Sequence, residues 1–131
     1  YNFCFVGTRN ASVRNAAPVY TDFDLWHEGW SGKRTFHILR FGVVPAAVDQ
    51  CQPDVVLFHL GTNDLMIGEK PEKIASNVQK LIQLFYAGNP SVTILLSKIL
   101  PSKAQDIHKR KVLYKLFQNV TTYTNENFKK R

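Results

Sequence analysis

Two short segments of the chain carry groups that could stabilise a negative charge formed during a reaction. The first is Gly61-Thr62-Asn63-Asp64, which directly follows a run of apolar residues. A carboxamide held at the end of a strand can donate a hydrogen bond to the oxyanion that forms in acyl transfer. Asn-Asp pairs are also common in ordinary polar turns that leave a strand. The segment alone therefore leaves both interpretations of Asn63 open.

The second segment is His27-Glu28-Gly29-Trp30-Ser31-Gly32. Its two glycines suggest backbone N–H groups that an anion can reach, which are the other component of an oxyanion hole. Taken alone, the segment is better explained as an ordinary loop with one packed tryptophan. Neither segment identifies a site without the other.

The elements that would position these segments follow the pattern of an α/β fold. The apolar run Val55 to Leu60 is typical of a strand buried on both faces of a parallel sheet, and ligands bind beyond the carboxyl ends of such strands. Alternating strands and helices predict a parallel sheet with crossover connections. Strands are expected at Tyr1–Gly7, Val55–Leu60 and Ser91–Leu100. Helices are expected at Pro71–Tyr86 and about Gln105–Phe128. Two short helical pieces are expected within Arg34–Gln50, because Gly42 and Pro45 interrupt the helical pattern there.

Composition limits the classes of protein to consider. The 131 residues predict one domain, 1–131, and 44% apolar with 21% charged residues is ordinary for a globular protein. The net charge is +7, but the sequence contains no known nucleic-acid-binding motif, so we expect no nucleic-acid partner. The sequence has no apolar stretch of membrane-spanning length.

Cysteine and sequon counts add little about function. Cys4 and Cys51 are too few for a disulfide framework or a zinc site, and Cys4 is expected to be a small buried apolar residue. We expect no signal peptide within these residues, and the two sequons, Asn10-Ala-Ser12 and Asn119-Val-Thr121, are compatible with secretion.

Together, the two segments resemble the second and third sequence blocks of the SGNH (GDSL-like) hydrolase superfamily, and in particular its carbohydrate-esterase and lysophospholipase-like branch. Residues 1–8, 27–32 and 53–65 carry the likeness in the family's order. The resemblance implies a three-layer α/β/α sandwich with a parallel, flavodoxin-like sheet. Its first and last strands would lie outside this chain.

The resemblance also implies roles for residues at the matching positions. Gly32 would supply a backbone N–H to the oxyanion hole, and Asn63 would supply a side-chain N–H. Gly61 and Asp64 would shape and support this site. Members of the family act without a metal or cofactor.

Different roles are expected for the histidines and for Glu28. In the family, His27 and Glu28 would border the cleft, where they contact substrate or pin the loop. His59 lies mid-strand and is expected to be a hydrogen-bonded core histidine rather than a catalytic base. The segment Asp106-Ile107-His108 is one residue too short for the family's Asp-x-x-His motif and is expected to start a helix.

The chain contains no Gly-Asp-Ser motif, which in the family carries the nucleophilic serine. We therefore expect a partial domain that is inactive alone and belongs to an ester hydrolase with a serine acyl-enzyme mechanism. Its substrate would be a small-molecule or carbohydrate ester, with deacetylation the expected reaction. The alternative is a non-catalytic module of the same fold that recognises a glycan or an acidic partner. The acyl group, the alcohol, the oligomeric state and the compartment stay open.

Overall fold

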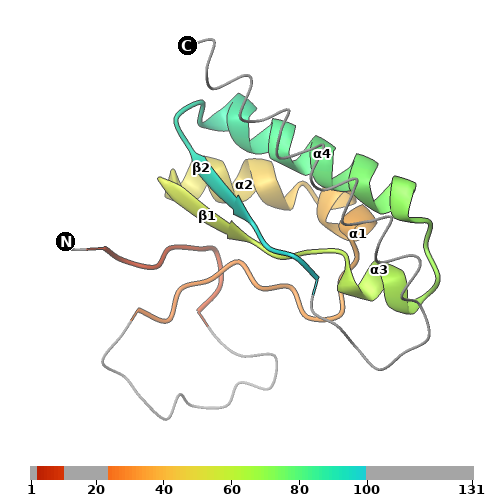
Figure 1. The fold of residues 1–131 in the computed structure, drawn as a ribbon. Helices are drawn as coiled ribbons and strands as arrows, with labels where there is room; N and C mark the ends of the chain where they lie inside the picture. Colours follow the sequence, from red (N-terminus) through yellow and green to blue (C-terminus); the bar gives the residue numbers. More distant parts are fainter. Residues whose placement is uncertain (1–2, 11–23, 100–131) are drawn as a thin grey trace.

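A computed structural model describes residues 3–10 and 24–99 of the chain (Figure 1). The described residues form two strands and four helices. In chain order these are α1 (Thr35–Arg40), α2 (Val43–Cys51), β1 (Val55–Phe58), α3 (Thr62–Met66), α4 (Pro71–Gly88) and β2 (Thr93–Leu96). The predicted helix at about Gln105–Phe128 lies outside the described residues.

The two strands pair in parallel, as the alternating pattern predicts. Val55 lies opposite Thr93 and Phe58 opposite Leu96, and α3 and α4 connect the strands. Both strands are shorter than predicted, with four residues each. Because the strands run in the same direction, both carboxyl ends lie at one edge of the sheet. The segment that contains α3 begins at that edge.

Helix α4 forms where the sequence predicts it. Pro71 occupies the first helical position, where its missing N–H removes no helical hydrogen bond. Its buried apolar residues recur at three- and four-residue spacing, and the helix ends just before Asn89 and Pro90. The main buried side chains of α4 are Ile74, Val78, Leu81, Ile82 and Phe85.

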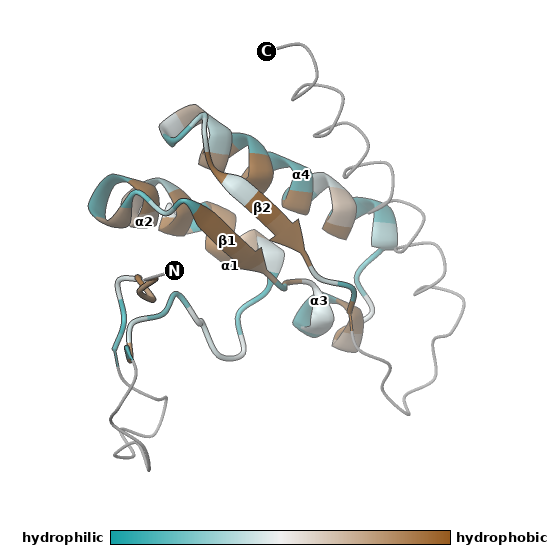
Figure 2. Cartoon of the chain, turned by 60° about the vertical axis from the view of Figure 1, so that its left-hand side comes forward, coloured by the Kyte–Doolittle hydropathy of each residue, from teal (hydrophilic) through white to brown (hydrophobic). Residues whose placement is uncertain are grey.

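The helices α1, α2 and α4 lie against one face of the sheet (Figure 1) and form one core with its strands. Figure 2 shows hydrophobic residues concentrated on the strands and on the helix faces turned toward them. Gly42, with a φ of 63°, separates α1 from α2, and Pro45 falls within the first turn of α2, so the prediction of two short helices is confirmed. None of the helices in the described ranges is long and apolar enough to cross a membrane.

The other face of the sheet is exposed, so the prediction that β1 is buried on both faces is wrong for the described part of the chain. Val55 is 53% exposed, Leu57 is 71% exposed and Leu95 on β2 is 53% exposed. These side chains alternate with inward-facing ones that pack on the helices. A continuous apolar run shows that both faces of a strand can be buried, but their burial depends on which elements pack against each face.

The aromatic segment at the start of the chain is not a strand over its described residues 3–7, contrary to prediction. Residues 3–10 instead run beside residues 24–28, where Arg9 and His27 form a single antiparallel bridge. Phe3 and Cys4 are exposed, so Cys4 is not the buried residue that the sequence predicted. Aromatic residues favour an extended backbone, but a strand also needs a neighbour with which to pair, and the described part offers only this bridge.

Candidate active site

The structure brings the two predicted segments together. The Asn63 side chain at the start of α3 donates a hydrogen bond from Nδ2 to the backbone oxygen of Lys33, at 2.9 Å. Gly32 and Lys33 are adjacent, and they lie 31 and 30 positions before Asn63 in the chain. The glycine loop and the carboxamide therefore meet beyond the carboxyl end of β1.

Gly32 lies in a tight turn that presents its backbone to solvent. The turn runs from Trp30 to Lys33 and is closed by a hydrogen bond from the Lys33 N–H to the Trp30 oxygen, at 3.2 Å. Gly32 has a φ of 69°, which favours glycine at this turn position. Its N–H has no hydrogen-bond partner within residues 3–10 and 24–99. This N–H can therefore donate to a ligand.

Asn63 offers a second donor of the same kind. A carboxamide has two N–H bonds, and the bond to the Lys33 oxygen uses one of them. That bond fixes the plane of the amide, while the second N–H has no other partner in the described part of the chain. N–H donors that are held in place before a reaction can stabilise a carbonyl oxygen that gains negative charge.

Asp64 anchors the start of α3 in the core. Its side chain is 2% exposed and accepts hydrogen bonds from the Thr35 N–H, at 2.9 and 3.2 Å, and from the Thr35 hydroxyl, at 2.6 Å. Asn77 of α4 donates in turn to the same hydroxyl, at 2.9 Å. The buried carboxylate is satisfied by these bonds and links α3 to α1 and α4. These bonds anchor the residue that directly follows Asn63.

Gly61 turns the chain sharply between β1 and α3. Its φ is 111°, and an added Cβ would lie 3.0 Å from Ile74 and 3.1 Å from Ile99. Both the backbone angle and the close packing therefore require glycine here. The Thr62 hydroxyl that follows is buried without a hydrogen-bond partner among the described residues.

Glu28 holds the glycine loop in place. Its carboxylate accepts hydrogen bonds from the Thr8 N–H, at 2.8 Å, from the Thr8 hydroxyl, at 2.8 and 3.0 Å, and from Trp30 Nε1, at 2.8 Å. The Arg9 guanidinium lies over the Trp30 ring, 4.7 Å from the ring centre. Of the two roles that the sequence left open for Glu28, these contacts support pinning the loop.

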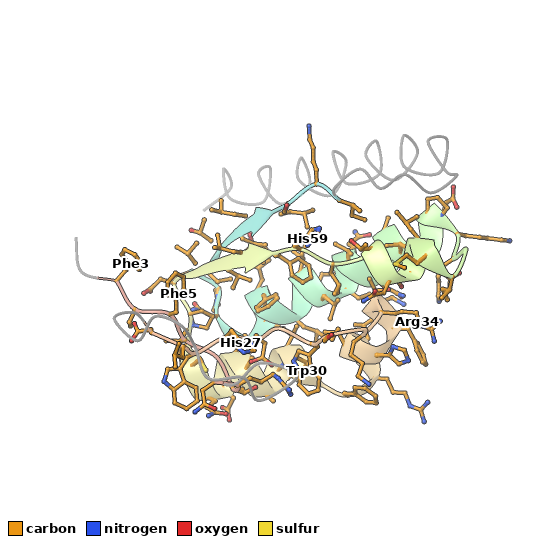
Figure 3. All side chains as sticks on the ribbon, turned by 90° about the horizontal axis from the view of Figure 1, so that it is seen from below. Phe3, Phe5, His27, Trp30, Arg34 and His59 are labelled. Carbon is orange, nitrogen blue, oxygen red and sulfur yellow. The ribbon has the colours of Figure 1, made fainter. Side chains whose placement is uncertain are left out.

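His27 also makes hydrogen bonds that hold the loop. Its backbone pairs with Arg9 through hydrogen bonds of 2.7 and 3.1 Å, and its Nδ1 accepts a hydrogen bond from the Gly29 N–H, at 2.9 Å. A Cβ on Gly7 would lie 2.2 Å from the His27 carbonyl carbon, so only glycine allows this approach. Figure 3 shows His27 and Trp30 along the same loop.

The prediction of a core histidine at position 59 is wrong. His59 lies just beyond β1 (Figure 3), is exposed, and makes no hydrogen bond to the described residues. It follows Leu57 on the side of the strand that the helices leave uncovered. Its position within the predicted strand therefore did not place it in the core.

Thr35 and Asn77 are site-supporting residues that the sequence reasoning missed. Thr35 lies 29 positions from Asp64 and 42 from Asn77, so no local spacing connects them. A signal was present at Asn77, because it is a polar residue on the apolar face of α4, which indicates a buried hydrogen bond. The described residues contain no group of His, Cys, Asp and Glu that could hold a metal ion.

Comparison with known families shows which family the chain belongs to. The model of the GDSL-like Lipase/Acylhydrolase family matches residues 7–125, which include both halves of the site. The chain belongs to this family. Its parallel sheet, helices and crossovers are those of an SGNH hydrolase, as its solved relatives also indicate.

Three relatives illustrate the likeness to other members of the GDSL-like family. An arylesterase of Vibrio mimicus is 36% identical over 59 residues, 45% of this chain and 30% of the relative. Crystal structures of an acetyl esterase mutant with an acetate ion, and of a carbohydrate esterase family 3 protein from Talaromyces cellulolyticus, each share 29% identity with a TM-score of 0.77. This chain is covered to 92% in both, and it spans 57% of each of those chains.

Proposed function

We propose that the full-length protein hydrolyses carboxylic esters, with acetyl groups on carbohydrates as its substrate class. The chain would contribute two oxyanion donors, the Gly32 N–H and the second N–H of Asn63. The observation that carries the proposal is the 2.9 Å hydrogen bond from Asn63 to the Lys33 oxygen. This bond places an oriented amide beside a glycine whose N–H is free among the described residues.

The proposed reaction proceeds through an acyl-enzyme. A serine hydroxyl from a Gly-Asp-Ser segment, which this chain does not contain, attacks the carbonyl carbon while a histidine takes its proton. The electron pair of the C=O bond moves to oxygen, where Gly32 and Asn63 donate to it. The C–O bond to the alcohol then breaks, and the histidine returns its proton to the leaving oxygen. Water hydrolyses the acyl-enzyme by the same steps.

The two donors help because they are fixed before the reaction begins. Glu28 holds the turn that contains Gly32, and Asp64 holds the start of α3, so neither donor needs to reorganise as charge develops. Donors that need no reorganisation stabilise the transition state more than the neutral substrate. The 131 residues alone would contribute these donors without a nucleophile and are therefore expected to be inactive.

The substrate class rests on the relatives. Two structures at 29% identity are titled as an acetyl esterase and a carbohydrate esterase, and the curated relative is named an arylesterase. Acetyl esters of sugars are therefore a better first choice than long-chain lipid esters. A small aryl acetate serves as a general substrate for the same chemistry.

The experiment measures hydrolysis of p-nitrophenyl acetate by the full-length protein, with acetate release from acetylated xylo-oligosaccharides in parallel. We expect turnover with a burst of p-nitrophenol, because acylation releases the phenol before the acyl-enzyme is hydrolysed. An organophosphonate should stop the turnover and leave one covalent label on a serine. Absence of turnover on all esters tested, with no serine labelled in a folded protein, would overturn the proposal.

A further inference from the structure

A surface patch of cations and aromatic rings begins directly beside the proposed site. We call it the basic–aromatic patch; its members are Lys33, Arg34, Phe36, His37, Arg40 and Phe41. Phe36 is 46% exposed and Phe41 is 52% exposed, while α1 buries Thr35 and Ile38 instead. Single exposed apolar residues need no explanation, but two phenyl rings among several cations are a specific surface.

Contacts within the patch hold its rings in place. Phe41 stacks on His37 with ring centres 5.9 Å apart and planes 20° apart, and Lys33 Nζ lies 5.7 Å from the Phe41 ring centre. The Phe36 ring is tilted by 59° to the imidazole, with ring centres 5.7 Å apart. The Arg34 backbone N–H donates to His37 Nδ1, at 3.1 Å, which fixes the orientation of the imidazole. The rings are therefore organised before any ligand arrives.

The charge of the patch is one-sided. No aspartate or glutamate occurs between Gly29 and Val48 in the sequence. The carboxylate of Asp64 is the acidic group bonded to this region, and its hydrogen bonds to Thr35 bury it. No carboxylate in the described ranges pairs with Lys33, Arg34 or Arg40. Apart from the contacts of Arg34 with His37 and of Lys33 with Phe41, these cations are available to a ligand that carries negative charge.

We infer that the basic–aromatic patch binds an acidic carbohydrate, a polymer of sugars with carboxylate groups, and directs its acyl groups to the site. The inference rests on the proposed function, because the Lys33 backbone oxygen is the group that holds Asn63. Sugar rings have apolar C–H faces that stack on phenyl rings, and uronate carboxylates complement Lys and Arg. A neutral glycan would use the rings but leave the cations unmatched.

The experiment measures binding of the full-length protein to acetyl-free polygalacturonate oligosaccharides by calorimetry, with neutral xylo-oligosaccharides for comparison. We expect uronate binding to be at least tenfold tighter than neutral binding and to weaken as salt rises. The variants Lys33→Gln/Arg34→Gln/Arg40→Gln and Phe36→Ala/Phe41→Ala should each weaken it about tenfold. The control Lys73→Gln/Lys80→Gln removes two exposed cations of α4 and should change it less than twofold.

Three results would overturn the inference. Equal binding of neutral and acidic oligosaccharides, or equal losses in the patch and control variants, would show that the patch does not recognise uronates. Tighter binding of a single-stranded oligonucleotide through the same residues would assign the patch to nucleic acid. The probe carries no acyl group, so this result is separate from the p-nitrophenyl acetate assay. Uronate binding without ester hydrolysis would overturn the proposed function and leave binding by the patch standing.

Discussion

The two halves of the candidate site are built in different ways. Asn63 lies next to Asp64, whose buried carboxylate connects three helices, and follows Gly61, which packs on α4. Gly32 instead lies in an exposed turn that is held by Glu28 from outside the core. The position of Asn63 is therefore tied to the stability of the fold, whereas the position of Gly32 depends on local hydrogen bonds.

This contrast predicts how substitutions on the two sides will differ. Substitutions of Asp64 and Gly61, the neighbours of Asn63, should lower the free energy of unfolding, because they disturb contacts that belong to the core. Changes around Gly32 should mainly increase the motion of the loop, because loops with few buried contacts open locally without global unfolding. The three predictions that follow test this contrast in the full-length protein.

The largest effect on stability is expected for Asp64→Ala. The substitution leaves the Thr35 N–H and hydroxyl buried without their acceptor and removes the link between α3 and α1. We expect the free energy of unfolding to fall by about 3–4 kcal/mol, measured by urea denaturation. The matched control is Asp49→Ala, an exposed carboxylate on α2, which should change it by less than about 0.5 kcal/mol. Equal effects of the two substitutions would contradict the anchoring role of Asp64.

A smaller loss is expected for Gly61→Ala. The new methyl group must accept a φ of 111° and close contacts with Ile74 and Ile99, which together should cost about 2–3 kcal/mol. Gly68→Ala is the control, because its φ is 80° and open space surrounds the position. It tests the backbone angle alone and should lower the free energy of unfolding by about 1 kcal/mol. If the two variants are equally stable, packing against α4 does not fix the turn.

The smallest effect on global stability is expected for Glu28→Gln. The amide keeps one acceptor oxygen but loses the charge and the second acceptor, so the bonds to Thr8 and Trp30 cannot all persist. We expect the free energy of unfolding to fall by at most about 1 kcal/mol, but the hydrogen exchange of the Thr8 amide to become faster. Glu72→Gln, an exposed residue of α4, should leave that exchange rate unchanged. An unchanged rate in Glu28→Gln would show that the carboxylate does not hold the loop.

The sequence predicted the parts of the fold that depend on local patterns. The apolar spacing and Pro71 located α4, and Gly42 marked the break between α1 and α2. The meeting of Gly32 and Asn63 was predictable only through the resemblance of both segments to one family, since each had an ordinary explanation alone. Their contact across 30 residues has no local signal.

The remaining features depend on neighbours that a local pattern does not specify. Leu57 and His59 were expected to be buried, but burial requires an element packed on their side of β1, and the described helices lie on the other. Phe3 lies in a segment with strand-forming residues but without a pairing ladder. The bonds from Asp64 to Thr35, and from Asn77 to the Thr35 hydroxyl, join three segments that come together only in the folded chain.

We propose that the Asn63 carboxamide stabilises the transition state and does more than tie the loop to α3. The most direct measurement compares kcat/KM for p-nitrophenyl acetate in wild type, Asn63→Ala and Glu28→Gln full-length protein. Loss of an oxyanion donor should lower kcat/KM by about 10²–10³-fold in Asn63→Ala, mainly through kcat, with little change in the urea midpoint. Glu28→Gln, which loosens the loop but keeps the carboxamide, should lose far less. Equal losses in the two variants, or an Asn63→Ala loss below about threefold, would contradict the claim.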